Sequence, residues 1–335
     1  MDWNKGFSAS YYATFVDPTS WRDLERFEIT EGSISMGGDE LRCSATLGAV
    51  GYERGTEKIV RIYLDARQTG DAELVPLFTG YAASPQQTFN GILETNPIDL
   101  YSVLTPVRDV LLQRGWYAPA EVPAGVLIKS LLAPTPAPVD IVDNSPALQE
   151  AIIAEDGESN LSMIDKILSA IDWRLRITGD GTIQIMPKAT EASAEYDPLD
   201  NDAIEPEIEV VQDWYQCPNC FRAVAGDLTA VARDDSENSA FSTVNRGREV
   251  WMEETDCDMN AGETIEEYAL RRLKEEQKIS TTASYKRRYN PNLFVTDLVQ
   301  LSYPKQGLEG LFRIETISIS LGYGCSCDEE VTKYE

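Results

Sequence analysis

The sequence predicts a mainly β protein in which two β-rich, barrel-like segments flank a smaller α+β segment. Three observations predict it: alternating runs fill the first third, helical and hairpin patterns fill the middle, and strand patterns return in the last third. At 335 residues the chain exceeds the usual size of a single core, so two or three domains are expected. The predicted segments are a first barrel-like domain at 1–98, an α+β domain at 99–190, an acidic linker at 191–208 and a second barrel-like domain at 209–335.

The first segment consists of alternating runs separated by turns. Apolar and polar residues alternate in four runs, namely Leu24–Ile34, Leu41–Ala49, Lys58–Arg67 and Leu74–Tyr81. This period of two is the pattern of half-buried strands. Glycine-containing turns at 37–39, 53–55 and 69–71 divide the runs at short spacing, which is typical of an antiparallel sandwich or barrel.

The middle segment combines helices with one hairpin. Helices are predicted near Val103–Gln113, Ala124–Leu132 and Leu161–Ile171, the last with Ser159 as its N-terminal cap. A hairpin follows over Trp173–Met186, because both of its flanks alternate and Gly-Asp-Gly at 179–181 tolerates positive φ. Residues 187–208 are polar and acidic and have little to bury, which predicts the linker.

The last segment carries the clearest helix. Thr264 and Glu267 have capping-box spacing, and apolar residues then recur every three or four positions through a helix at 264–279. Glu267 and Arg271 are placed to form an i,i+4 ion pair. Strand-like runs surround the helix, at 221–226, 290–301 and 310–321, so the helix is predicted to lie within the second barrel-like domain.

Composition excludes several classes of function. The formal charge is −27, with 56 acidic residues, which opposes binding of nucleic acid through its phosphates. Histidine is absent, which excludes Ser-His-Asp and Cys-His nucleophiles and histidine-based zinc hydrolases. No apolar run is long enough for a membrane span, and the N-terminus lacks the order of a secretory signal, so we expect folding in a cytosol.

Six cysteines leave a metal site open. A candidate thiolate cluster consists of Cys217, Cys220, Cys325 and Cys327, a ligand set that suits zinc or an iron–sulfur cluster. The CxxC and CxC pairs flank the second barrel-like domain, with Cys325 and Cys327 just past its last predicted strand. CxC is weak as a zinc motif, so free thiols are favoured, no cofactor is assigned, and disulfides are the third alternative.

Aromatic residues offer a second chemistry. Trp173, Trp214 and Trp251 are expected to be core residues, with a sugar-binding platform as the alternative. No catalytic residue is assigned, because no motif marks a carboxylate pair, a phosphate loop or a redox helix. The expected protein is therefore not an enzyme.

The order of these elements resembles that of the tail hub proteins of tailed bacteriophages, which include the baseplate hub of contractile tails and its siphophage and prophage counterparts. The resemblance is carried by the hairpin at 173–186, the Pro218-Asn219 step into a strand, the helix at 264–279, and the runs at 290–299 and 21–30. It covers nearly the whole chain and rests on pattern more than on rigid motifs. The cysteines around Pro218-Asn219 depart from it.

The resemblance implies a structural virion protein with two barrel-like tube domains. Three chains would form a pseudo-sixfold ring that closes the sixfold tail tube, meets a threefold tip or spike, and forms part of the DNA channel. The implied partners are two further copies, tail tube and distal tail proteins, and the tip or spike protein, while DNA passes without specific binding. The expected location is the virion tail tip, after assembly in the host cytoplasm. Two alternatives remain: a tail-associated glycan hydrolase that uses a carboxylate pair, and a thiolate metal-binding interaction module.

Overall fold

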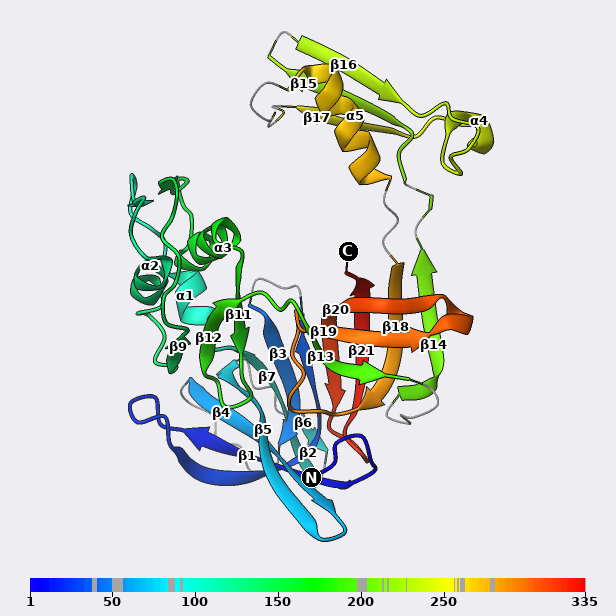
Figure 1. The fold of residues 1–335 in the computed structure, drawn as a ribbon. Coiled ribbons are helices and arrows are strands. Elements are labelled where there is room, and N and C mark those ends of the chain that lie inside the picture. Colours follow the sequence, from blue (N-terminus) through cyan, green and yellow to red (C-terminus); the bar gives the residue numbers. More distant parts are fainter. Residues whose placement is uncertain are drawn as a thin grey trace. The chain divides into compact units, whose positions relative to one another are not determined.

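This computed structural model describes residues 1–37, 41–49, 57–83, 88–90, 93–197, 204–212, 214–215, 217–226, 228–255, 257, 259, 263–277 and 281–334. The predicted turn at 53–55 and most of the one at 37–39 lie outside them. The chain divides into a large unit, Met1–Glu209 with Ser284–Glu335, and a small unit, Val210–Ala283. The mainly β fold class with small helical insertions is confirmed (Figure 1).

Six strands of the large unit form an antiparallel ring, in the order β1 (Ser8–Val16), β4 (Lys58–Gln68), β5 (Asp71–Ala83), β7 (Leu93–Ser102), β3 (Cys43–Ala49) and β2 (Asp23–Met36). The ring closes because β2 also pairs with β1, with Ala13 opposite Phe27. A short strand, β6 (Thr88–Asn90), pairs with β7. Ala45 and Leu47 are buried while Thr46 is exposed, as the alternation predicts. In this closed ring, both edges of every strand are hydrogen-bonded to a neighbouring strand. The segment is therefore a barrel and not a sandwich.

A second sheet continues from β2. Its strands follow the order β20 (Leu308–Ser320), β21 (Ser326–Lys333), β18 (Thr281–Arg288) and β14 (Ile204–Gln212). The first half of β20 also pairs with β19 (Leu298–Tyr303), which pairs in parallel with β13 (Ala192–Tyr196), and the turn η1 (Pro304–Gln306) joins β19 to β20. Apolar side chains of β20, including Phe312, Ile314 and Ile317, are buried in this sheet.

The acidic linker predicted at 191–208 is wrong for its described residues. β13 and the start of β14 lie in this range, and Tyr196 and Ile204 are buried anchors on these two strands. The exposed glutamates that make the segment read as a linker are on the opposite face of β14. A sheet can pack one face on a core and leave the other in water, so exposed glutamates are compatible with a strand.

The α+β segment packs around one core of its own. Its elements are α1 (Thr105–Asp109), β8 (Tyr117–Ala118), α2 (Ala124–Leu131), β9 (Val139–Ile141), β10 (Ile152–Ile153), α3 (Asn160–Ala170), β11 (Trp173–Ile177) and β12 (Ile183–Pro187). β11 and β12 form the predicted hairpin, and β9 adds to β12 in parallel. Ser159 caps α3 as predicted, because its side chain accepts a hydrogen bond from the Ser162 amide.

The hairpin turn fixes this segment to the first barrel. Trp21 Nε1 and Arg61 Nη2 each donate to the carbonyl oxygen of Asp180, at 2.9 Å in both cases. Thr79 Oγ1 donates to the Gly179 carbonyl at 2.8 Å. A Cβ at Gly179 would lie 1.8 Å from the Pro76 carbonyl oxygen, so only glycine allows the turn to come this close.

The small unit is a three-stranded sheet covered by a helix. Its elements are β15 (Cys220–Ala225), β16 (Leu228–Arg233), α4 (Thr243–Arg246), β17 (Trp251–Thr255) and α5 (Ile265–Glu276). β15 lies in the centre, antiparallel to β16 and parallel to β17. The predicted helix and its capping box between Thr264 and Glu267 are confirmed.

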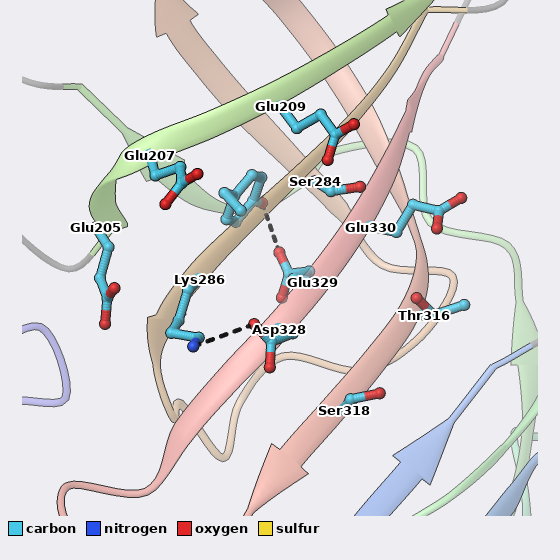
Figure 2. Close-up of a pocket in the computed structure, with 11 residues that line it drawn as sticks. Glu205, Glu207, Glu209, Ser284, Lys286, Thr316, Ser318, Asp328, Glu329 and Glu330 are labelled. Carbon is cyan, nitrogen blue, oxygen red and sulfur yellow. Dashed lines mark hydrogen bonds and ion pairs between the residues drawn. The ribbon is translucent and has the colours of Figure 1, made fainter.

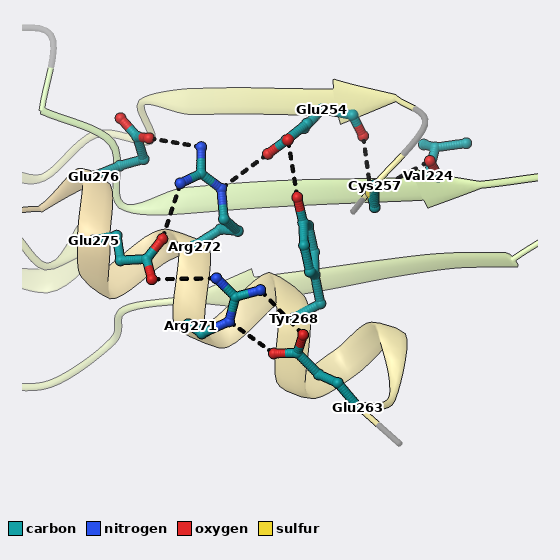
Figure 3. A network of polar contacts seen from close by, with 9 residues as sticks. All are labelled: Val224, Glu254, Cys257, Glu263, Tyr268, Arg271, Arg272, Glu275 and Glu276. Carbon is teal, nitrogen blue, oxygen red and sulfur yellow. Dashed lines mark hydrogen bonds and ion pairs between the residues drawn. The ribbon is translucent and has the colours of Figure 1, made fainter. Parts of the chain in front are cut away.

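The placement of α5 differs from the prediction that it belongs to the second barrel-like domain. Its buried stripe, which includes Tyr268 and Leu273, shares a core with Phe221 of β15 inside the small unit. Arg271 bonds to Glu263 and Glu275 instead of the predicted Glu267 (Figure 3). The carboxylate of Glu267 instead accepts a hydrogen bond from the Thr264 amide in the capping box.

Candidate functional site

An acidic surface lies on the second sheet of the large unit. On β14, alternation places Glu205, Glu207 and Glu209 on one exposed face. On β21, Asp328 and Glu330 are exposed in the same way. These side chains border a hollow of ≈ 320 Å³ together with residues of β18 and β20 (Figure 2). We call this surface the acidic face.

Small hydroxyl side chains extend the acidic face across neighbouring strands. Thr316 lies opposite Glu330, and Ser318 lies opposite Asp328. Ser318 also lies opposite Ser35 of β2 on its other side. Residues directly opposite in an antiparallel pair point to the same side of the sheet, so the carboxylates and hydroxyls share one surface.

The hydroxyl row continues into the first barrel. Ser35 is opposite Ser44 of β3, and Ser33 is opposite Thr46, with 3.0 Å between their side-chain oxygens. Thr46 is in turn opposite Asp99 of β7. One polar surface with short side chains therefore runs from the second sheet into the barrel.

The acidic face carries little positive charge. Lys286 is the one cation among the described residues that line the hollow, and its Nζ lies 3.6 Å from Asp328 Oδ1. Glu205, Glu207 and Glu209 come within five residues of the chain on a single strand. Like charges at this spacing repel a polyanion, and the surface offers a phosphate no paired guanidinium to bind.

A buried polar cluster supports the acidic face from within the sheet. Glu329, between the two exposed acids of β21, accepts hydrogen bonds from Tyr285 Oη and Arg287 Nε of β18, each at 2.5 Å. Burial raises the pKa of Tyr285, and the charge of Glu329 adds to this shift. Burial alone would lower the pKa of Arg287, but the adjacent Glu329 carboxylate outweighs it and raises that pKa.

The glutamates of β14 are candidate functional residues that the sequence prediction misses. Their segment reads as a linker because it is acidic and follows a proline-containing stretch. The three glutamates are spaced two residues apart, and Ile204 and Ile208 occupy alternate positions. This alternation is typical of a strand with one charged face.

The four predicted thiolate ligands are divided between the two units. Cys217 and Cys220 lie in the small unit, and Cys325 and Cys327 in the large unit. Cys327 is inside β21, so it does not follow the last strand as predicted. Burial raises the pKa of Cys325 to about 11, so this thiol resists the ionisation that a thiolate ligand requires.

Among the described residues, no group of three or more His, Cys, Asp or Glu side chains is placed to hold a metal ion. The metal cluster stays a prediction, and metal analysis of the purified protein before and after Cys217→Ser tests it. Cys43, Cys220, Cys257, Cys325 and Cys327 are free thiols in this structure.

The three tryptophans do not share one environment. Trp173 is 8% exposed and packs in the α+β core, as predicted. The prediction of a core position is wrong for Trp214 and Trp251, which are 57% and 46% exposed. Trp251 lies on the side of β17 opposite α5, where alternation places side chains that the helix does not cover.

Membrane insertion through a helix is not supported by the part of the chain that the structure describes. None of its helices has the length and apolar character that a bilayer crossing requires.

Comparison with known proteins identifies the fold. No protein-family model matches the chain, and no curated protein matches it in sequence. A tail protein from Neisseria meningitidis MC58 superposes with a TM-score of 0.65 at 15% identity, over 98% of this chain and 97% of that one. The 43 kDa tail protein of prophage MuSo2 from Shewanella oneidensis gives 0.61 at 14% identity, over 97% and 98%.

A chain of the Francisella PdpA–VgrG complex is also similar, with a TM-score of 0.58 at 8% identity, over 98% of this chain and 58% of that one. The chain thus has the fold of these tail proteins along nearly its whole length. The resemblance to phage tail proteins is confirmed at the level of the fold.

Proposed function

We propose that this protein is a structural component of a phage or prophage tail, the hub that closes the tail tube and lines part of the DNA channel. The acidic face carries this proposal: it is a continuous surface of carboxylates and small hydroxyls on the fold shared with the tail proteins. Glu205, Glu207 and Glu209 would face the lumen.

The electrostatics suit passage of DNA without binding. Duplex DNA carries one negative charge per about 1.7 Å of its axis, and carboxylates repel it over a screening length of about 10 Å at 0.1 M salt. Serine and threonine side chains such as Ser35, Ser44 and Ser318 are short, so they leave the surface smooth. A polyanion sliding past this surface meets repulsion and no specific contact.

The arrangement of the two β sheets supports a ring with pseudo-sixfold symmetry. The closed barrel and the second sheet are joined through the β2–β20 pairing, where Ser35 lies opposite Ser318. In a ring of three copies, the barrel and the second sheet of each copy together would provide six similar positions around the axis. Such a ring would match a sixfold tube on one side and a threefold tip or spike on the other. The partners in this proposal are two further copies, the tail tube and distal tail proteins, and the tip or spike protein, with assembly in the host cytoplasm and final location in the virion.

The role proposed is not enzymatic. A glycan hydrolase needs one carboxyl group kept protonated by an apolar environment beside a second, ionised one. The carboxylates of the acidic face are exposed, and the buried Glu329 is held by Arg287. Neither arrangement provides a general acid.

Electron microscopy of assembled tail ends tests the proposal. We expect three copies in a ring, with Glu205, Glu207 and Glu209 lining the passage. Native mass spectrometry of the purified chain with its tube and tip partners should show three copies per complex. A monomer at the periphery of the tail, or an acidic face turned away from the passage, would contradict the proposal.

A further inference from the structure

A second hollow in the large unit has a different chemistry from the acidic face. It measures ≈ 180 Å³ and lies where the β11–β12 hairpin approaches β2, β3 and the segment before β19. Apolar side chains form much of its wall, among them Met36, Phe294 and Val295. Two arginines, Arg42 and Arg176, also line it, together with Glu315, whose carboxylate pairs with Arg313 at 2.8 Å. Two guanidinium groups around one small apolar hollow are unexpected in a chain of net charge −27.

Arg176 lacks an acidic partner within the described residues. Its Nε donates to Gln184 Oε1 at 2.7 Å, and its guanidinium carbon lies 4.4 Å from the centre of the Phe294 ring. Burial lowers the pKa of Arg176, so the charge is held in a partly dehydrated place. Asp297, whose charge acts on Arg176, is engaged by Arg174 Nη1 at 2.8 Å. Half-buried charged side chains are normally paired. The guanidinium of Arg176 instead lies beside the hollow.

One further donor at the hollow is unsatisfied. The Nε atom of Arg42, which lines the hollow, is buried and has no hydrogen-bond partner. Arg42 binds Asp165 through Nη2. A buried donor without a partner costs about 1–3 kcal/mol, so an anion that accepts from this group would recover the cost.

The backbone on both sides of the hollow is strained. Arg42 has φ = 65° and Thr296 has φ = 70°, in the left-handed region that side chains with a Cβ rarely adopt. For Thr296, which is β-branched, this is a genuine outlier. Strain of this kind costs about 1–3 kcal/mol and concentrates at binding sites. Both residues line the hollow.

We propose that this hollow is a binding site for a carboxylate carried on a small apolar body, with Arg176 as its main anchor and Arg42 as its second donor. A planar guanidinium matches a carboxylate in a two-point hydrogen bond. A cavity of about 150 Å³ accommodates benzene, so the apolar part can be as large as one ring or a leucine side chain. The carboxylate belongs either to a free organic acid or to the C-terminal residue of a partner protein.

Fluorine NMR with the full chain tests the site, with 4-fluorobenzoate as the probe. We expect saturable binding of 4-fluorobenzoate and binding about tenfold weaker, or weaker still, for the uncharged 4-fluorobenzamide. Arg176→Gln should weaken binding of the benzoate by about tenfold or more. The matched control Arg222→Gln removes an exposed arginine of the small unit, which pairs with Glu253, and should leave the affinity unchanged.

A second variant tests the apolar part of the hollow without removing a charge. Val295→Trp fills the apolar part of the hollow and should abolish binding of both fluorinated probes, with an unchanged near-ultraviolet circular dichroism spectrum to show that the fold persists. The peptide acetyl-Gly-Gly-Phe with a free carboxylate distinguishes the sources. If it displaces the probe while its C-terminal amide does not, the ligand is a chain end, and if only 4-fluorobenzoate binds, it is a free acid. Absence of saturable binding for both acids, or equal binding by Arg176→Gln, would overturn the proposal.

Discussion

Arg287 and Glu329 form an ion pair whose side chains are 1% and 0% exposed, at the centre of the sheet that carries the acidic face. The two residues lie on neighbouring strands, β18 and β21, and Tyr285 donates a second hydrogen bond to the same carboxylate. Such a pair is weak evidence for stability by itself, but removal of one partner leaves the other charge buried and uncompensated. The strand β21 thus alternates exposed acids, Asp328 and Glu330, with a buried acid that has a cationic partner.

Glu329→Gln should destabilise the large unit by about 3–5 kcal/mol, because Arg287 loses its counter-charge in a dry environment. Chemical denaturation followed by tryptophan fluorescence measures the change. The control Glu330→Gln makes the same substitution at the exposed neighbour and should shift the free energy of unfolding by less than about 0.5 kcal/mol. Equal effects of the two substitutions would show that the pair does not carry this role.

Gly179→Ala should destabilise the docking of the hairpin turn on the first barrel by about 3 kcal/mol or more, because the new methyl group would overlap the Pro76 carbonyl oxygen. Thermal unfolding reports the loss. Gly6→Ala is the matched control, since a Cβ at Gly6 has no heavy atom within 4 Å and no strained backbone. A melting temperature that is equally insensitive to both substitutions would contradict the close approach.

Thr264→Ala should lower the stability of the small unit by about 1 kcal/mol, because the capping box loses the hydroxyl that accepts from the Glu267 amide. Hydrogen exchange of amides in α5 measures the effect locally. The exposed neighbour Glu266→Ala lies outside the capping box and should change exchange much less. Exchange protection that persists in Thr264→Ala would mean that packing of Tyr268 and Leu273 alone holds the helix end.

Stability should decline above about pH 9, because buried thiols resist ionisation in the folded state. Burial raises the pKa of Cys325 from 9.0 to about 11 and that of Cys43 from 9.0 to about 12. Between the ordinary and the raised pKa, the folded protein keeps a proton that the unfolded chain loses, so stability is present below pH 9 and is lost as pH rises.

Urea denaturation midpoints at pH 7.5, 9 and 10.5 measure this dependence. Cys325→Ala should make the decline shallower, since one of the resisting groups is gone. Val331→Ala, a buried and non-titrating change on β21, should lower the midpoint by a similar amount at every pH. A pH dependence in Cys325→Ala as steep as in the unmodified chain would exclude this thiol as a cause.

The secure predictions from sequence concern local structure. Alternation over Lys58–Arg67 marks β4, Ser159 marks the start of α3, and Thr264 with Glu267 marks the start of α5. The Gly-Asp-Gly turn identifies the β11–β12 hairpin. Each of these features depends on residues a few positions apart. Their interactions can therefore form independently of the rest of the chain.

Such short-range patterns do not predict contacts between segments that are far apart in the chain. Local sequence is enough to show that Glu205, Glu207 and Glu209 carry charge and that α5 forms. The folded structure is needed to show that these glutamates belong to a sheet edge instead of a linker, and that α5 covers β15 instead of a barrel. Arg42 and Asp165, which pair across 123 residues, show the reason. Pairing at that range is selected by burial and by the register of whole sheets, and no short-range spacing in a single sequence encodes it.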